Sequence, residues 1–157
     1  MEIQAAMGIS QIADIDRFIE KRRSIAGSVA KVLDGTPLKL LGTEYLRNRS
    51  LHRAHSWMLL PIQITGNESN IEMLHNRKGK ILDKFADVNI ETRPVLTGNF
   101  LAQPGLQRLM GNRQKPVDFP RANYYSATTF LVGCHHDFTF EQVEYLVSNI
   151  AEIARSF

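Results

Sequence analysis

The densest set of ligand-type side chains in this 157-residue chain is Gly133-Cys134-His135-His136-Asp137. Cysteine and histidine are the ligands that zinc prefers, so the run raises the question of a metal site. Neighbouring residues of a strand point to opposite faces, however, which keeps Cys134 and His135 from sharing one ion. No second Cys and His pair stands at zinc spacing elsewhere. The sequence therefore predicts no metal here, and instead a strand end that presents one histidine, His135, to a pocket.

A second polar group follows a predicted strand, in the segment Ile90-Glu91-Thr92-Arg93-Pro94-Val95-Leu96-Thr97-Gly98-Asn99-Phe100. The proline after Arg93 keeps the arginine backbone extended. Gly98 permits a sharp turn, which is expected to expose Thr97 and Asn99. The arginine fork can donate two parallel hydrogen bonds to a phosphate or carboxylate. One interpretation is the rim of a binding pocket, and the alternative is a surface arginine beside an ordinary turn.

Motifs that carry a complete reaction are absent from the sequence. There is no Gly-x-Ser-x-Gly elbow for a nucleophilic serine. There is also no Gly-x-x-x-x-Gly-Lys phosphate loop and no dinucleotide fingerprint. Isolated serines, histidines and aspartates occur, as they do in most chains. We therefore expect no self-sufficient catalytic site in this chain.

The composition is that of a globular protein, with 43% hydrophobic and 22% charged residues. The net charge of +3 is mild and its basic residues are scattered, which argues against a nucleic-acid partner. No apolar run has the length of a membrane helix, and no signal-peptide pattern opens the chain, so a cytoplasmic location is the expectation. The single cysteine excludes an internal disulfide.

The apolar pattern predicts one long helix followed by a small α/β domain. Apolar residues recur at helical spacing from Glu2 to Leu33, and the Asp34–Pro37 segment ends this helix. We accordingly divide the chain into residues 1–35 and 36–157. Some apolar residues fall outside the main stripe of the long helix. They are covered either by something outside the chain or by the strands of the domain itself, and they are Ile3, Met7 and Phe18.

The remaining pattern predicts an α+β sandwich with about three antiparallel strands packed against helices. The expected strands are 57–64, 90–96 and 129–132, and the expected helices are about 71–85, 106–110, 121–127 and one after residue 139. Pro61 indicates an edge position or a bulge in the first strand. Asn89 is predicted to end its helix in the left-handed conformation. Thr139-Phe140-Glu141-Gln142 matches a capping box for the last helix.

Four segments in order resemble the nucleotide-sugar aminotransferase and 3-dehydrase family, which are fold-type I, vitamin B6-dependent enzymes. The most specific is Ile90–Pro94 with Thr97-Gly98-Asn99-Phe100 and Gln103-Pro104. Residues 2–23 are similar to the helix that joins the family's two domains. Segments 56–61 and 130–143 are similar to the first strand of its small domain and to its last strand and helix. The resemblance covers nearly the whole chain and implies the small C-terminal domain of such an enzyme.

The Thr-Gly-Asn-Phe form after Arg-Pro is closer to the 3-dehydrase branch of this family. In that branch the cofactor is pyridoxamine 5′-phosphate, and a His replaces the usual Schiff-base Lys. A nucleotide-linked 4-keto-6-deoxyhexose loses its C3 hydroxyl, which leads to dideoxysugars for surface polysaccharides such as the O-antigen of lipopolysaccharide. The alternatives are a pyridoxal 5′-phosphate-dependent sugar aminotransferase that uses glutamate, or a non-catalytic module that binds a partner through its first helix.

The resemblance also implies that the cofactor, its Lys or His base and its phosphate grip belong to a large domain that precedes these residues. This chain is then expected to hold no cofactor, to have no catalytic residue and to be inactive alone, whereas the full-length enzyme is expected to be a homodimer. The resemblance places Arg93, Thr97 and Asn99 beside the nucleotide-linked sugar, with His135 as a further substrate-binding residue.

Overall fold

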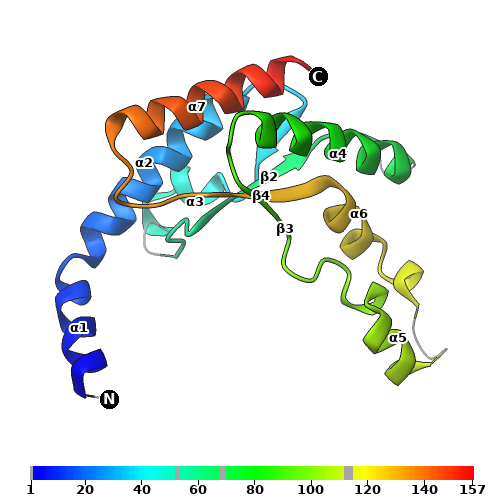
Figure 1. Cartoon of the computed structure of the whole chain (residues 1–157), viewed down its shortest axis with the longest axis horizontal. Coiled ribbons are helices and arrows are strands. Elements are labelled where there is room, and N and C mark those ends of the chain that lie inside the picture. Colours follow the sequence, from blue (N-terminus) through cyan, green and yellow to red (C-terminus); the bar gives the residue numbers. More distant parts are fainter. Residues whose placement is uncertain (1, 52–53, 68–69, 112–114) are drawn as a thin grey trace.

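The computed structural model describes residues 2–51, 54–67, 70–111 and 115–157 (Figure 1). The helices are α1 (Glu2–Ala13), α2 (Ile15–Leu33), α3 (Glu44–Arg47), α4 (Ile71–Asp87), α5 (Pro104–Met110), α6 (Pro120–Thr128) and α7 (Phe140–Arg155). Short 3-10 turns are η1 (Arg49–Leu51), η3 (Phe100–Ala102) and η4 (Pro116–Asp118). The strands are β1 (Leu38–Leu40), β2 (Leu59–Ile64), β3 (Thr92–Pro94) and β4 (Thr129–Gly133).

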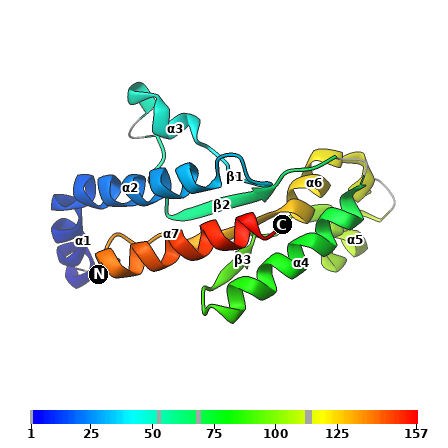
Figure 2. The ribbon, with the colours of Figure 1, turned by 90° about the horizontal axis from the view of Figure 1, so that it is seen from above.

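Within the described residues, the strands form one antiparallel sheet in the order β1-β2-β4-β3. The three predicted strands are confirmed, and β1 is a fourth that is too short to show alternation. Helices α2, α7 and α4 lie over one face of the sheet (Figure 2). Two arms that end in α1 and α5 project beyond the opposite face (Figure 1). The domain is therefore a sheet with helices on one side and a concave surface on the other.

The core lies between the sheet and the three covering helices. Buried residues recur three and four positions apart in each helix, as an apolar stripe requires. They include Ile25, Val29 and Leu33 in α2, Leu74, Ile81 and Phe85 in α4, and Leu146, Ile150 and Ile153 in α7. The rings of Phe85 and Phe130 meet at the centre, with centroids 5.4 Å apart and an interplanar angle of 59°. Such tilted pairs are a favourable aromatic geometry.

The predicted long helix is interrupted at Asp14, which has φ −100° and ψ −1°. None of the residues in α1 is buried, so no packing against the sheet holds α1 in line with α2. Ile3 and Met7 are 79% and 65% exposed, whereas Phe18 packs on His136 with ring centroids 3.9 Å apart. The domain itself thus covers Phe18 alone of the three. No helix in the described part of the chain is long and apolar enough to cross a membrane.

Two residues with restricted or unusual backbone conformations, Asn89 and Pro61, were singled out from the sequence. Asn89 has φ +53° after α4, so the predicted left-handed C-cap is confirmed. Pro61 was expected at an edge or a bulge. The edge position is wrong, since β2 lies between β1 and β4, and the pairing with β4 continues through Pro61 without a bulge. The pairing of β1 ends at Leu40, opposite Ile62, and the Pro61 carbonyl then accepts from the Leu41 amide at 2.9 Å. A missing N–H is tolerated at that point because the neighbouring strand has ended.

Helix α7 begins with the predicted capping box. The Thr139 amide donates to Gln142 Oε1 at 2.9 Å, and the Gln142 amide donates to Thr139 Oγ1 at 3.3 Å. Phe138 and Val143 flank the cap and pack against the core, as in a hydrophobic staple. The cap fixes the start of α7, and the short segment between β4 and α7 carries His135.

Candidate functional site

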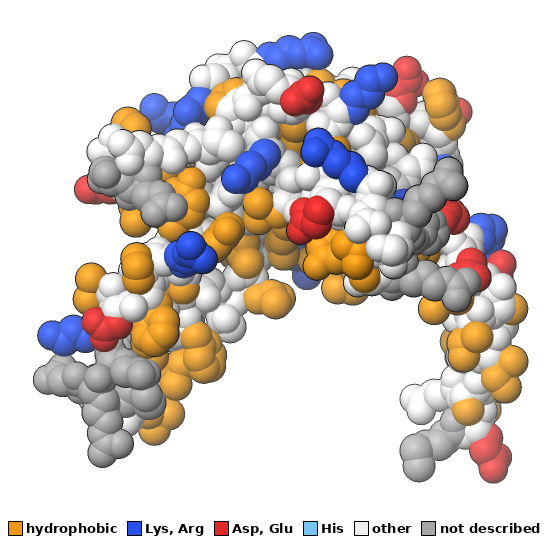
Figure 3. Space-filling view, turned by 180° about the vertical axis from the view of Figure 1, so that it is seen from behind, with side chains coloured by type: hydrophobic (Ala, Val, Ile, Leu, Met, Phe, Trp, Pro, Cys, Tyr) orange, Lys and Arg blue, Asp and Glu red, His pale blue; other side chains and the backbone are white. Residues whose placement is uncertain are grey.

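The face of the sheet opposite the core carries part of the predicted site. The register places Pro61, Leu131 and Arg93 in one row across β2, β4 and β3. Side chains alternate along a strand, so this row points away from the buried Ile62 and Phe130. We call this surface the open face, and it is presented by Lys39, Leu59, Pro61, Arg93, Leu131 and Gly133. Figure 3 shows hydrophobic side chains gathered on the underside of the molecule, between its projecting arms.

Arg93 and Lys39 are the cations of the open face, and the Arg93 side chain is 67% exposed. Its Nε and Nη2 lie 3.0 and 2.9 Å from Glu91 Oε1. An ion pair this exposed stabilises a fold by only about 0.2–1 kcal/mol. The guanidinium has five N–H donors, so it can turn from Glu91 to a phosphate or carboxylate at little cost. The sequence did not reveal Glu91 as a partner, because pairing two residues apart depends on the strand geometry.

The Thr97 turn follows β3 and has an unusual backbone. Leu96 and Gly98 have positive φ values of +36° and +59°. The Gly98 amide donates to the Val95 carbonyl at 2.6 Å, and Gln103 Nε2 donates to the Thr97 carbonyl at 3.0 Å. The Thr97 side chain is exposed, as predicted. The backbone of this turn is thus held by two hydrogen bonds, and it presents the Thr97 side chain at the surface.

Asn99 was expected to be exposed by the same turn, and that expectation is wrong, since it is 4% exposed. Its Nδ2 donates to Asn123 Oδ1 at 2.6 Å and to the Pro116 carbonyl at 3.0 Å. Its Oδ1 accepts from the Leu101 amide at 3.2 Å, which caps η3. The polar groups of Asn99 are thus engaged with the protein, because η4 and α6 fold back over the turn. Its place in a substrate site stays a prediction.

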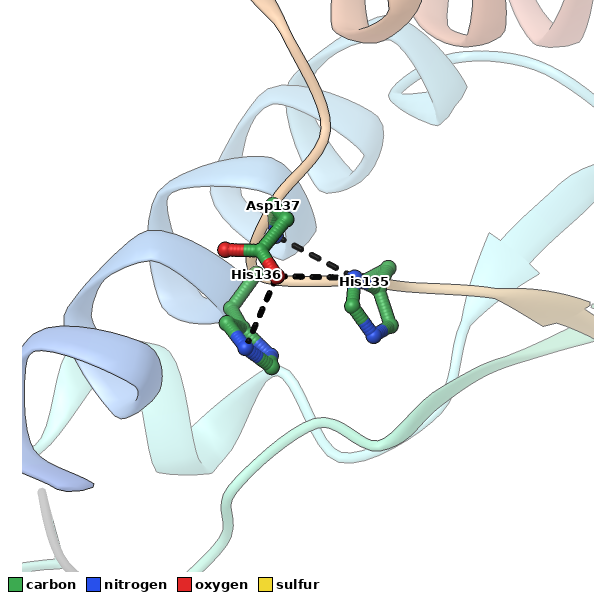
Figure 4. Close-up of side chains that lie close together, drawn as sticks. All are labelled: His135, His136 and Asp137. Atoms are coloured by element: carbon green, nitrogen blue, oxygen red, sulfur yellow. Dashed lines mark hydrogen bonds and ion pairs between the residues drawn. The ribbon is translucent and has the colours of Figure 1, made fainter. Parts of the chain in front are cut away.

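His135 stands just beyond β4 with a side chain that is 57% exposed (Figure 4). The Asp137 amide donates to His135 Nδ1 at 3.2 Å. A neutral imidazole that accepts at Nδ1 carries its proton on Nε2. His135 therefore offers an N–H donor toward solvent, which suits a ligand oxygen. By contrast, Cys134 is buried, and burial raises the pKa of its thiol to about 12.

The side chains of His135, His136 and Asp137 bring atoms of metal-ligand type within 4.8 Å of one another. Arg22 Nη2 lies 3.2 Å from His136 Nδ1, and arginine can only donate, so this nitrogen accepts. The His136 proton then sits on Nε2, which faces Asp137 Oδ2 at 3.3 Å. A metal would need the lone pair that this proton occupies. Arg22 is thus hydrogen-bonded to His136, which lies at ion-pair distance from Asp137, and sequence spacing alone could not reveal this arrangement because Arg22 is more than a hundred residues away.

The predicted residues do not form one cluster. Arg93 and His135 share the open side of the sheet, and the four residues from Leu131 to His135 put them about 13 Å apart along β4. The turn with Thr97 and Asn99 lies beyond the opposite end of β4, since Pro94 pairs with Phe130. The arrangement suits an elongated ligand with separate polar groups better than a compact one.

Comparison with known proteins finds matches over nearly the whole chain. Residues 1–151 match the DegT/DnrJ/EryC1/StrS aminotransferase family. A curated relative is the dTDP-4-dehydro-2,6-dideoxy-D-glucose 3-dehydratase of Saccharopolyspora spinosa, which is 26% identical over 99% of this chain and 31% of its own length.

Solved structures share the fold. Helicobacter pylori PseC, an aminotransferase involved in the biosynthesis of pseudoaminic acid, has a TM-score of 0.72 at 19% identity, over 99% of this chain and 38% of its own. The Escherichia coli GDP-4-keto-6-deoxy-D-mannose-3-dehydratase with bound hydrated PLP has a TM-score of 0.65 at 21% identity, over 95% of this chain and 34% of its own. The chain thus spans about a third of the length of these relatives.

Proposed function

Because the chain belongs to the DegT/DnrJ/EryC1/StrS aminotransferase family, we propose that it is the C-terminal part of a nucleotide-sugar 3-dehydrase. The reaction removes the C3 hydroxyl of a nucleotide-linked 4-keto-6-deoxyhexose with pyridoxamine 5′-phosphate, in the cytoplasm, for surface polysaccharide synthesis. The observation that carries the proposal is the match of nearly the entire chain to a 3-dehydratase. The similarity to PseC favours a second candidate, a sugar aminotransferase.

Within the described residues, the groups of the candidate site are not arranged to hold the cofactor. Its phosphate needs several donors that converge on one point, whereas Arg93 and His135 lie about 13 Å apart along the sheet. Lys78, a buried lysine, donates to a carbonyl of its own domain. We therefore place the cofactor, its base and its phosphate grip in a large domain outside these residues, and expect the chain alone to be inactive.

Arg93 on the open face, together with Thr97 and His135 beyond its two ends, supplies binding groups for the substrate in this proposal. Arg93 leaves Glu91 and pairs with negative charge on the nucleotide. The Thr97 hydroxyl and the His135 Nε2–H donate to oxygens elsewhere on the same elongated molecule. Asn99 contributes by holding the Thr97 turn, since its amide group already spans α6 and η4. Each of these roles orients substrate, and none requires a proton to leave the chain.

The apolar residues of α1 support a large domain, or its partner in a homodimer, as the neighbour of this arm. Ile3, Met7, Ile9 and Ile12 are each at least 65% exposed. Apolar surface of this kind is buried against a partner in most stable proteins. A non-catalytic module would use the same helix to bind an unrelated protein.

Arg93→Ala in the full-length enzyme is expected to weaken substrate binding about 10- to 100-fold, because charge-assisted hydrogen bonds are among the strongest polar contacts. KM and calorimetric affinity for the substrate measure this change, and cofactor absorbance is expected to stay the same. Arg155→Ala is the matched control, since Arg155 is also exposed but lies on α7, away from the open face. An unchanged KM in Arg93→Ala removes this residue from the site.

The product distinguishes the two candidate reactions. A 3-dehydrase is expected to yield a keto sugar that lacks the C3 hydroxyl, whereas an aminotransferase yields an amino sugar that keeps it. NMR of the product from a nucleotide-linked 4-keto-6-deoxyhexose checks this directly. A His at the Schiff-base position of the large domain agrees with the first outcome and a Lys with the second. Amino sugar as the sole product would rule out the dehydrase.

A further inference from the structure

Lys78 occupies a position in α4 that the helical pattern gives to apolar residues. Leu74, Ile81 and Phe85 lie four, three and seven residues away on the same face, and all are buried. Lys78 itself is 8% exposed. Lysine is almost never buried to this degree without a partner, since removing its charge from water is costly. Burial accordingly lowers the pKa of Lys78.

The partner of Lys78 is the end of a neighbouring helix. Lys78 Nζ donates to the Ser126 carbonyl at 2.6 Å. Ser126 lies in the last turn of α6, where a backbone carbonyl finds no N–H donor within the helix. A cation is favoured there by the helix dipole. Helix α6 is also held by Gln63 Nε2, which donates to Thr128 Oγ1 at 3.2 Å, and by Tyr124, which packs against the core. The Lys78 bond adds a direct link between α6 and α4.

Helix α6 also contacts the turn that contains Thr97. A Cβ added at Gly98 would overlap Ser126 Oγ, so the backbone of the turn lies directly on Ser126. One residue further on, Asn99 Nδ2 donates to Asn123 Oδ1 at 2.6 Å. Gly98 and Asn99 therefore both rest on α6, at positions one turn apart along it. A shift of α6 must move the turn with it.

We propose that Lys78 is a positioning residue for the substrate-binding turn. Through the Ser126 carbonyl it fixes α6 against α4, and α6 in turn fixes Gly98 and Asn99. This assignment rests on the proposed function, in which the Thr97 hydroxyl meets the nucleotide-linked sugar. The mechanical coupling from α4 to the turn requires no substrate, so it can be tested separately.

The test is amide hydrogen exchange, measured by NMR, in Lys78→Met and wild-type protein of 157 residues. Methionine has a similar length and suits an apolar environment, so the variant is expected to fold. Two amides report on the turn, Gly98 through its bond to Val95 and Leu101 through its bond to Asn99. Both are expected to exchange about tenfold faster or more, because a hydrogen bond from a charged group has been lost.

The matched control is Lys80→Met, which removes an exposed lysine from the same helix and is expected to leave both amides unchanged. Equal exchange in a folded Lys78→Met protein overturns the proposal. If that variant does not fold, the coupling is tested in the wild-type protein by a pH titration of the Lys78 amine followed by NMR. The Ser126 and Gly98 resonances are expected to move with it, and a Gly98 resonance that stays fixed while Ser126 moves overturns the coupling.

Kinetics of the full-length enzyme separate this proposal from the proposed function. Lys78→Met is expected to raise KM several-fold with kcat nearly unchanged, and Lys78→Arg, which keeps a charged donor, is expected to restore part of the loss. Faster exchange with an unchanged KM would keep the coupling but remove the turn from the substrate site. Unchanged exchange with a normal KM would reject Lys78 and leave the proposed function standing.

Discussion

Replacing Gly98 with alanine is expected to destabilise the domain by about 2–4 kcal/mol, from two costs that add. The backbone of Gly98 has φ +59°, which an L-residue adopts only with strain. The new methyl group would also overlap the side chain of Ser126, so either the turn or α6 must move. Chemical denaturation measures the loss of stability. Because both costs fall on the turn, substrate affinity of the full-length enzyme is expected to fall as well.

The matched control for Gly98→Ala is Gly79→Ala. Gly79 lies inside α4, where a methyl group would meet open space outside the helix's own backbone. Alanine is favoured over glycine in a helix interior, so this variant is expected to gain about 0.5–1 kcal/mol. Opposite signs for the two glycines are the expected result. A Gly98→Ala protein as stable as wild type would show that the turn is not held against α6.

Replacing Phe85 with alanine is expected to cost about 3–5 kcal/mol, which is the range for deleting a fully buried aromatic ring. Phe85 is fully buried and stacks at a tilt on Phe130 of the central strand β4. The deletion leaves a cavity between α4 and the sheet that neighbouring side chains fill only in part. A denaturant midpoint measured by circular dichroism reports the change.

Phe140→Ala is the control for Phe85→Ala, since Phe140 is 74% exposed at the start of α7. Little apolar area is lost there, so a change below about 1 kcal/mol is expected. Equal effects at the two positions would contradict the placement of the core between α4 and β4.

Local signals in the sequence were sufficient for the elements whose ends have specific chemistry. The capping box at Thr139 and the left-handed Asn89 were predicted because each depends on residues within one helical turn. The same reasoning failed at Asp14, where α1 and α2 separate. The apolar periodicity continues through Asp14. Because no residue of α1 is buried, no packing keeps the axis of α1 in line with that of α2.

Long-range pairing decided the features that local patterns left open. Pro61 in a central strand is tolerated because β1 ends beside it, and the end of β1 depends on a partner strand distant in sequence. Asn99 is buried because α6 and η4 return to it, which its own turn does not require. Lys78 stands out in the sequence as a charge in an apolar stripe, but its partner could not be read from that stripe.

The sequence by itself determined which residues could do chemistry and which family they resemble, because side-chain type and short spacings survive without coordinates. It identified Arg93, Thr97 and His135, which the structure places at the surface. Only the tertiary structure decided how they are arranged. Antiparallel pairing of β3 with β4 puts Arg93 and His135 on one side and sends the Thr97 turn to the other end. Strand register is set by contacts between distant segments, so no local pattern contains it.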